Sequence, residues 1–289
     1  MGAMTWWDGT LGDERGPGGP VADLLRGVGD GVFETCSVVG GRPFALTRHL
    51  RRLARSASAL GFAAPDEGEI RAAIAHVLAA GGPDLGRLRV SVFAGPGPLS
   101  ADRSAEGTSR PTVSVLAGRA VRPETVRVVR VPWVRNERSA VVGLKTTSYA
   151  ENVVALADAV RRGADEALVA NMRGELCEGT SSNVFVERAG ELVTPALASG
   201  CLPGITRELM LEWGSEAGLP LREAWPGELP VTVLDDVARG AQGTGLAVSS
   251  SVRGLVPVSS LDGVDLAVGP ISLDARRLFE ARCKEDLDP

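Results

Sequence analysis

The stretch Gly143-Leu144-Lys145-Thr146-Thr147-Ser148-Tyr149 carries the most chemical information in this chain. The sequence has 31 Lys plus Arg, yet only Lys145 and Lys284 are lysines, and Tyr149 is the only tyrosine. A guanidinium stays protonated and forms no imine, whereas a desolvated lysine loses its proton and attacks a carbonyl. A lysine retained in a chain that otherwise uses arginine therefore indicates a need for an amine.

The two lysines have different surroundings in the sequence. Lys284 lies in the charged run Cys283-Lys284-Glu285-Asp286 and is predicted to be solvated. Lys145 follows Val141, Val142 and Leu144, which predicts that it ends a buried strand. The alternative is a lysine whose stem covers apolar surface while its charge stays in water, as many lysines do. The residues further along the chain decide between these two possibilities.

Composition limits the class of protein. A length of 289 residues and 44% hydrophobic residues predict one large or two medium domains with a full core. No apolar run is long enough for a membrane span, and a net charge of −5 without a basic cluster argues against nucleic acid. The four cysteines form no CxxC pair and only two histidines are present, so no metal site is predicted. The start of the sequence has no basic segment followed by an apolar one, which predicts no secretory signal, and the cysteines are expected to be the reduced thiols of a cytoplasmic protein.

Hydrophobic periodicity predicts a mixed α/β fold with many short antiparallel strands in its second half. Helices are predicted from Thr47 to Gly61, around Ile70–Leu78, on the apolar set Val153, Leu156, Ala157 and Val160, after Gly204, and over 272–285. Strands are predicted around 5–7, 31–35, 88–92, 113–115, 126–133, 166–171, 183–186, 192–193 and 246–249, and loops at 12–20 and 95–110. A segment without periodicity predicts a linker at 119–125, which separates domains at 4–118 and 126–289.

Four features together indicate a phosphorylated aldehyde cofactor. Lys145 supplies an amine, and Glu178 places a carboxylate in a polar turn where burial requires a cationic partner. Gly204-Ile205-Thr206 begins a helix whose free amides suit a phosphate, and Ser251 lies in a hydroxyl-rich turn that suits the same anion. Each feature alone is weak, since most helix starts bind nothing. An amine, a carboxylate and a phosphate cup without metal ligands indicate pyridoxal 5′-phosphate.

Five motifs in order resemble the class IV, or fold type IV, pyridoxal-phosphate enzymes, which include branched-chain and D-amino acid aminotransferases and 4-amino-4-deoxychorismate lyases. They are Gly29-Asp30-Gly31-Val32-Phe33-Glu34-Thr35, His49-Leu50-Arg51-Arg52-Leu53, Leu144-Lys145, Glu178-Gly179-Thr180-Ser181-Ser182-Asn183-Val184-Phe185 and Leu202-Pro203-Gly204-Ile205-Thr206-Arg207. The resemblance implies a small N-terminal α/β domain, a larger C-terminal pseudo-barrel domain, and a homodimer with its active site at the domain and subunit interface.

The resemblance also implies a role for each matching residue. Lys145 would hold the cofactor covalently and then move the α-proton of the substrate. Glu178 would pair with the pyridine nitrogen, and Tyr149 would lie near the phenolic oxygen. Phosphate binding would fall to Arg52, Ile205, Thr206 and Ser251, with Asn183 in support.

Within the family, the lysine motif and Ser250-Ser251-Val252-Arg253-Gly254 look most similar to aminodeoxychorismate lyases, which make p-aminobenzoate for folate biosynthesis. The chain lacks the Tyr-Ile-Arg-Pro strand usual in branched-chain enzymes, and Gly240–Gly245 replaces an acidic pair often seen in the family. Arg89 or Arg253 would hold a substrate carboxylate, although a salt bridge or an exposed charge accounts for each equally well. A lyase is therefore the first hypothesis, an aminotransferase the second, and a non-catalytic cofactor-binding protein the third.

Overall fold

The computed structural model describes residues 4–7, 9–12, 29–61, 63–94 and 110–289. The chain folds into two compact units. Unit 1 comprises Met1–Val121, Leu144–Ser148 and Asp286–Pro289, and unit 2 comprises Arg122–Gly143 and Tyr149–Glu285. The predicted loops at 12–20 and 95–110 lie almost entirely outside the described residues.

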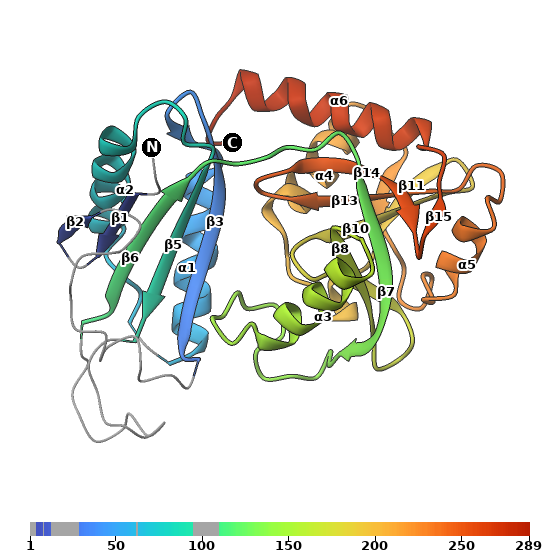
Figure 1. Ribbon diagram of the computed structural model, residues 1–289, viewed down its shortest axis with the longest axis horizontal. Coiled ribbons are helices and arrows are strands. Elements are labelled where there is room, and N and C mark those ends of the chain that lie inside the picture. Colours follow the sequence, from blue (N-terminus) through green and yellow to red (C-terminus); the bar gives the residue numbers. More distant parts are fainter. Residues whose placement is uncertain (1–3, 8, 13–28, 62, 95–109) are drawn as a thin grey trace. The chain divides into compact units, whose positions relative to one another are not determined.

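Unit 1 is an antiparallel sheet with two helices on one face (Figure 1). The strand order is β2-β1-β6-β5-β3-β4. The strands are β1 (Met4–Trp7), β2 (Thr10–Gly12), β3 (Gly31–Val39), β4 (Arg42–Pro43), β5 (Arg87–Phe93) and β6 (Thr112–Gly118), and the helices are α1 (Leu46–Ala59) and α2 (Glu67–Gly81). The predicted strands and helices of this part of the chain are confirmed.

Alternation along the strands of unit 1 separates an apolar face from a polar one. Side chains two residues apart share a face of a strand, so Val32, Cys36 and Val38 of β3 point to the helices. Leu50 and Leu53 of α1 belong to the same core. The opposite face of β3 and β5 carries Phe33, Thr35, Arg89 and Ser91, which pair as Phe33 with Ser91 and Thr35 with Arg89.

Unit 2 is built on a larger mixed sheet with the strand order β12-β11-β10-β13-β14-β7-β8-β9. Its strands are β7 (Val126–Arg135), β8 (Glu166–Asn171), β9 (Leu176–Gly179), β10 (Asn183–Arg188), β11 (Glu191–Thr194), β12 (Leu221–Glu223), β13 (Gly245–Ser250), β14 (Gly254–Leu261) and β15 (Val264–Asp265), which pairs with β14. Its helices are α3 (Ala150–Arg161), the short 3₁₀ helix η2 (Leu197–Ser199), α4 (Ile205–Glu216), α5 (Val233–Ala238) and α6 (Pro270–Glu285).

The sheet of unit 2 curls back on itself. Strand β9 lies at the end of the strand order, several strands away from β10. Only residues 180–182 connect these two strands, and the Gly179 amide donates to the Ser182 carbonyl at 2.7 Å. A connection this short brings the end strand back beside β10, which gives the sheet a barrel-like curvature and places the turn after Glu178 at the point of closure.

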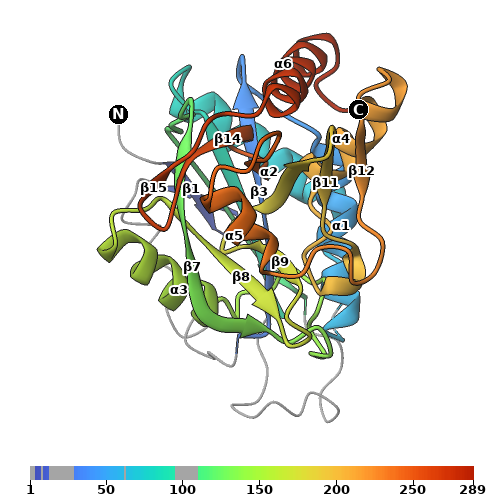
Figure 2. The same cartoon turned by 90° about the vertical axis from the view of Figure 1, so that its right-hand side faces the viewer.

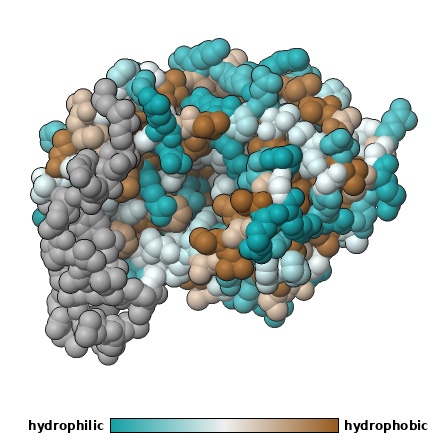
Figure 3. Space-filling model, viewed as in Figure 1, coloured by the Kyte–Doolittle hydropathy of each residue, from teal (hydrophilic) through white to brown (hydrophobic). Residues whose placement is uncertain are grey.

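Helix α3 is confirmed, although the apolar residues that predicted it do not form its buried face. Asn152, Ala155 and Ala159 are the buried residues, at helical spacing. The two alanines pack with residues of β7 and β8, and Figure 2 shows α3 alongside these strands. Their small side chains allow close approach to the sheet. Val153 and Val160 are exposed instead. Figure 3 shows hydrophobic residues, in brown, among hydrophilic ones on the face that it draws.

The prediction that Lys145 ends a buried strand is wrong. Val141 and Val142 are exposed, and residues 141–145 belong to no strand. The chain instead lies along β3, where Thr146 forms an isolated antiparallel bridge with Val32. The Phe33 amide donates to the Lys145 carbonyl at 3.0 Å. A pairing between residues more than 100 positions apart leaves no periodic signal around the lysine.

In the described part of the chain, no helix combines the length and the apolar character that crossing a membrane requires.

Candidate active site

The amine of Lys145 lies over an aromatic ring of unit 1. Its Nζ is 4.5 Å from the centroid of the Phe33 ring, a cation–π geometry. The Lys145 amide donates to Ser56 Oγ of α1 at 3.4 Å. The lysine therefore lies between the first residues of β3 and the last turn of α1, and it is half-buried rather than solvated.

A buried ion cluster orients Arg52 one helical turn before Ser56. Its Nε and Nη2 both donate to the Glu34 carboxylate at 2.7 Å, and His49 Nδ1 contacts the same carboxylate at 2.7 Å. Burial alone raises the pKa of Glu34, but Arg52 and His49 outweigh it and hold this pKa at about 2. Burial lowers the pKa of His49, and the nearby Arg52 and Lys145 charges lower it further. The Glu34 carboxylate acts in the opposite direction but does not outweigh them.

Arg89 shares the Phe33 ring with Lys145. Its guanidinium carbon is 4.0 Å from the ring centroid, and its Nε donates to Ser91 Oγ at 3.3 Å. Arg89 is exposed on the polar face of β5. One aromatic side chain therefore has both a lysine amine and an arginine guanidinium within cation–π distance.

In unit 2, Glu178 is a buried carboxylate with two partners that the sequence did not reveal. The Leu202 amide donates to Glu178 Oε2 at 2.8 Å, and Arg135 Nη2 lies 3.3 Å from Oε1. The same arginine donates to Asn152 Oδ1 at 3.2 Å. A guanidinium beside a buried carboxylate favours its ionised form. The expected need of Glu178 for a cation is thus met within unit 2 by Arg135.

Asn183 ties the first residue of β10 to the start of α4. Its Nδ2 donates to the Leu202 carbonyl at 2.8 Å. A Cβ at Gly204 would overlap Asn183 Oδ1, so only glycine allows this approach. Gly204 precedes α4 and has no side chain to cap it, which leaves the first amides of the helix to be satisfied by another group.

Tyr149 and Ser251 both belong to unit 2, Tyr149 beside the turn after β9 and Ser251 in the turn after β13. The Tyr149 hydroxyl donates to the Thr180 carbonyl at 3.0 Å. Ser251 is in the turn after β13, where the Arg253 amide donates to Ser250 Oγ at 3.3 Å. The neighbouring Ser249 Oγ is buried and has no hydrogen-bond partner among the described residues.

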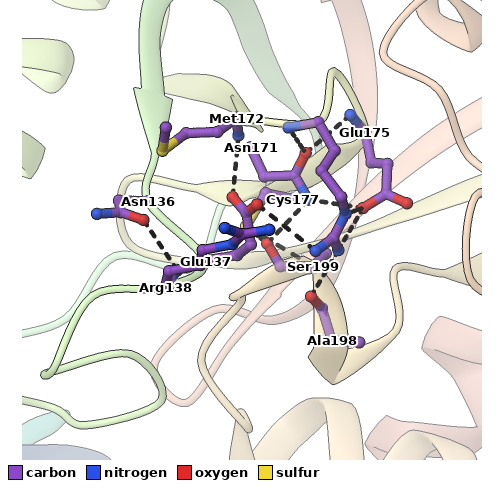
Figure 4. A network of polar contacts seen from close by, with 10 residues as sticks. Asn136, Glu137, Arg138, Asn171, Met172, Glu175, Cys177, Ala198 and Ser199 are labelled. Carbon is purple, nitrogen blue, oxygen red and sulfur yellow. Dashed lines mark hydrogen bonds and ion pairs between the residues drawn. The ribbon is translucent and has the colours of Figure 1, made fainter.

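A hydrogen-bond network holds the hairpin that carries Glu178 (Figure 4). Asn171 Nδ2 donates to the Ser199 carbonyl at 3.2 Å, and Cys177 Sγ contacts the same carbonyl at 3.4 Å. The Met172 amide donates to Glu137 Oε2 at 3.1 Å. The network joins β8, β9, η2 and the loop after β7, and so it fixes the strand on which Glu178 lies.

The predicted site residues form two sets, one in each unit. Lys145, Arg52 and Arg89 belong to unit 1 and are linked through Phe33, Glu34 and Ser56. In unit 2, Glu178 and Asn183 both bond to Leu202, just before α4. Ile205 and Thr206 are the first two residues of that helix. Tyr149 contacts the turn after Glu178. Sequence reasoning missed Arg135, because a single ionic residue in a strand has no distinctive pattern.

Comparison with known proteins identifies the class. The family model for amino-transferase class IV matches residues 31–261, and the chain belongs to this family. A Methanocaldococcus jannaschii protein named "Putative branched-chain-amino-acid aminotransferase" is 30% identical over 245 residues, which cover 81% of this chain and 80% of that protein.

Two solved structures extend the likeness to the fold. The pyridoxal-phosphate-bound form of "a hypothetical aminotransferase from Mycobacterium tuberculosis" is 28% identical, with a TM-score of 0.79 over 96% of this chain and 98% of that one. A Legionella pneumophila protein titled "Putative 4-amino-4-deoxychorismate lyase" is 24% identical, with a TM-score of 0.78 over 94% and 97%. The fold is therefore fold type IV, as predicted, and the enzyme depends on pyridoxal phosphate.

The residues present fit this cofactor. The half-buried Lys145 amine suits the aldehyde, the Glu178 carboxylate suits a protonated pyridine, and the uncapped start of α4 suits a phosphate. The orphaned Ser249 hydroxyl, on the strand that leads to Ser251, leaves one more donor in this region. When bound, the cofactor supplies a conjugated ring that accepts electrons from the amino-bearing carbon of a substrate.

Proposed function

We propose that this protein is an aminotransferase that acts on amino acids carrying a second anionic group. The observation that carries the proposal is the shared ring of Phe33, with Lys145 Nζ at 4.5 Å and the Arg89 guanidinium at 4.0 Å from its centroid. An amine that reacts at the α-carbon and a guanidinium held beside the same ring suit a substrate with a distal carboxylate. Arg89 thereby keeps the substrate-binding role expected for it.

The surroundings of Arg89 support an anionic rather than a branched aliphatic side chain. The face of β3 and β5 around it carries Thr35 and Ser91, and Arg89 itself is exposed. A branched-chain substrate gains its affinity from apolar contacts, which this face offers through Phe33 and through Leu116, the β6 residue directly opposite Arg89. The name of the M. jannaschii relative supports transamination. The Arg89 guanidinium favours amino acids with a second carboxylate, such as glutamate.

The proposal assigns each residue of the chain a task. Lys145 holds the cofactor, and its amine is the base that removes the proton from the α-carbon of the substrate and later returns it. Glu178 keeps the pyridine nitrogen protonated and is itself held by Leu202 and Arg135. The phosphate is bound by Arg52, Ile205, Thr206 and Ser251, Tyr149 lies near the phenolic oxygen, and Asn183 supports the start of α4.

A panel of donors tests the proposal. L- and D-glutamate, aspartate, leucine, valine and alanine are each assayed with 2-oxoglutarate and with pyruvate. We expect the acidic donors to give the highest kcat/KM, and Arg89→Leu to raise their KM at least ~10-fold while changing that of alanine little. Arg87→Leu, on the same strand, is the matched control. Equal rates for leucine and glutamate, with no effect of Arg89→Leu, would overturn the anionic preference.

The second candidate is the 4-amino-4-deoxychorismate lyase reaction. It is favoured by the motif Leu144-Lys145-Thr146 with Ser148-Tyr149 and by the turn Ser250–Gly254. Its substrate also carries carboxylates, so Arg89 serves either reaction. Incubation with aminodeoxychorismate would release p-aminobenzoate and pyruvate in equal amounts, without a keto acid acceptor. Absence of both products removes this candidate and leaves the aminotransferase.

The homodimer that the resemblance implies and the cytoplasmic location expected from the sequence belong to the same proposal. Light scattering on the purified protein tests the first, with an expected mass of twice 30.0 kDa. A mass that stays at that of one chain at all protein concentrations would contradict the dimer.

A further inference from the structure

Glu166, the first residue of β8, is a buried carboxylate that the proposed reaction does not use. It has no exposed surface. Its oxygens accept hydrogen bonds from Thr180 Oγ1, from the Ser181 amide at 3.0 Å and from Ser181 Oγ at 2.7 Å. A carboxylate removed from water costs several kcal/mol unless a cation pairs with it, so its partner matters to the whole cluster.

That partner is Arg253. Its Nη2 forms an ion pair with Glu166 Oε2 and also donates to Ser181 Oγ at 3.2 Å. Its Nε donates to Ser250 Oγ at 3.2 Å. The side chain is 15% exposed, so the guanidinium points into unit 2 rather than outward. Arg253 therefore joins two turns: residues 180–182, which follow Glu178, and residues 250–253, which contain Ser251.

The first of these turns also holds the single tyrosine. The Thr180 carbonyl accepts from Tyr149 Oη at 3.0 Å and from Asn152 Nδ2 at 2.6 Å, while its amide donates to the Ala167 carbonyl at 3.0 Å. A continuous set of contacts thus runs from Arg253 through Glu166 and Thr180 to the Tyr149 hydroxyl. Loss of the Arg253 charge leaves Glu166 buried without its cation and releases the turn that holds Tyr149.

We propose that Arg253 is a positioning residue that fixes Tyr149 and the Ser251 turn through Glu166, and that it is not the residue that binds a substrate carboxylate. The proposal rests on the function proposed above, in which Tyr149 and Ser251 contact the cofactor. It gives Arg253 a role different from the one expected from the sequence and leaves Arg89 as the residue that recognises the substrate anion. The fork of the guanidinium suits this role, because it bonds Glu166, Ser181 and Ser250 at once.

The test compares Arg253→Met, Arg253→Lys and the double variant Glu166→Gln/Arg253→Met with the parent protein. Arg222→Met is the matched control, because Arg222 pairs with Glu191 and Glu228 elsewhere in unit 2. Each protein is titrated with pyridoxal phosphate, melted, and assayed with one acidic and one neutral amino donor. Hydrogen exchange is measured for the amides of residues 180–183.

We expect Arg253→Met to weaken cofactor binding at least ~10-fold, to lower kcat for both donors alike, to lower Tm and to speed exchange at residues 180–183. The double variant should recover part of the Tm, because it removes the unpaired carboxylate, and Arg253→Lys should fall between parent and Arg253→Met. Arg222→Met should leave cofactor binding unchanged. If Arg253→Met does not fold, the double variant gives the same cofactor titration.

A selective rise in KM for the acidic donor, with Tm, cofactor affinity and exchange unchanged, would overturn the proposal and return Arg253 to substrate binding. Failure of the proposed function has a different signature. In that case the parent protein itself transaminates neither donor, while the cofactor titration, melting and exchange data still report whether Arg253 holds the Thr180 turn.

Discussion

The Leu202 amide donates to Glu178 Oε2 at 2.8 Å. The carbonyl of the same Leu202 accepts from Asn183 Nδ2 at 2.8 Å. One residue just before α4 therefore orients the carboxylate assigned to the pyridine nitrogen and ties it to the helix start assigned to the phosphate. These two backbone contacts fix the geometry of this part of unit 2 independently of the side chain of residue 202.

Glu178→Gln should keep the cofactor but slow the proton transfer at the substrate. A neutral amide cannot keep the pyridine nitrogen protonated, so the ring accepts electrons less well. We expect kcat to fall at least ~100-fold, with cofactor affinity changed less than ~10-fold. Rapid-mixing absorbance measurements of the first turnover check this. A variant as fast as the parent would remove Glu178 from this role.

Gly204→Ala should weaken cofactor binding. The backbone of Gly204 is in the extended region at φ −71°, so alanine introduces no strain, but its Cβ would overlap Asn183 Oδ1. Displacement of Asn183 breaks its bond to Leu202 and shifts the start of α4. We expect at least ~10-fold weaker binding of pyridoxal phosphate by titration. Gly118→Ala is the control, since its nearest contact is Arg87 Nε at 3.9 Å, and equal effects in both variants would contradict the assignment.

The stability of unit 1 should fall as the pH falls. The pKa of Glu34 is about 2 in the folded protein and 4.5 ordinarily, and burial lowers the pKa of His49 below its ordinary 6.5. Both groups bind protons more readily when unfolded, so the unfolding free energy decreases below pH 6.5 for His49 and between about 4.5 and 2 for Glu34.

Hydrogen exchange of the α1 amides as a function of pH, corrected for the intrinsic rate, measures this dependence. His49→Gln should flatten the dependence above about pH 5 and leave the acid limb that belongs to Glu34. Protection of α1 that increases on acidification would contradict the assignment of these two groups.

Asp288→Ala should destabilise α1. The residue before this helix, Ala45, has a φ of 52° and provides no side-chain cap. Asp288 caps it from the end of the described chain, accepting from the Thr47 amide at 2.8 Å and from Thr47 Oγ1 at 2.6 Å. Loss of such a cap costs about 1 kcal/mol. Denaturant unfolding measures the change, and Asp274→Ala, which breaks only an exposed pair with Arg277, should have almost none.

The sequence predicted the elements far better than their long-range partners. Strand β8 was predicted at its observed bounds, because local alternation records burial on a sheet. The attachment of Lys145 to β3 and the capping of α1 by Asp288 join residues more than 100 positions apart, and no local pattern reports such pairing. The apolar set of α3 misled for a different reason: alanines, not valines, fit against the sheet.

In the candidate site, too, the sequence predicted the local motifs but not their distant ionic partners. The motifs around Lys145, Glu178 and Gly204 predicted the class of chemistry, because an amine, a carboxylate and the amides of a helix start together suit pyridoxal phosphate. The ionic partners did not follow from sequence, since Arg135 and Arg253 resemble any other arginine in an arginine-rich chain. Arg135 pairs with Glu178 and Arg253 pairs with Glu166. These pairings follow from the burial of the two carboxylates, which only the fold reveals.

The most direct measurement is the site of covalent attachment of pyridoxal phosphate. The protein is incubated with the cofactor, reduced with borohydride, digested and analysed by mass spectrometry. Because the chain has only two lysines, the outcome is unambiguous. We predict one adduct, on Lys145, and the loss of that adduct in Lys145→Ala. An adduct on Lys284 alone, or no adduct with the visible band absent, would contradict the assignment of Lys145.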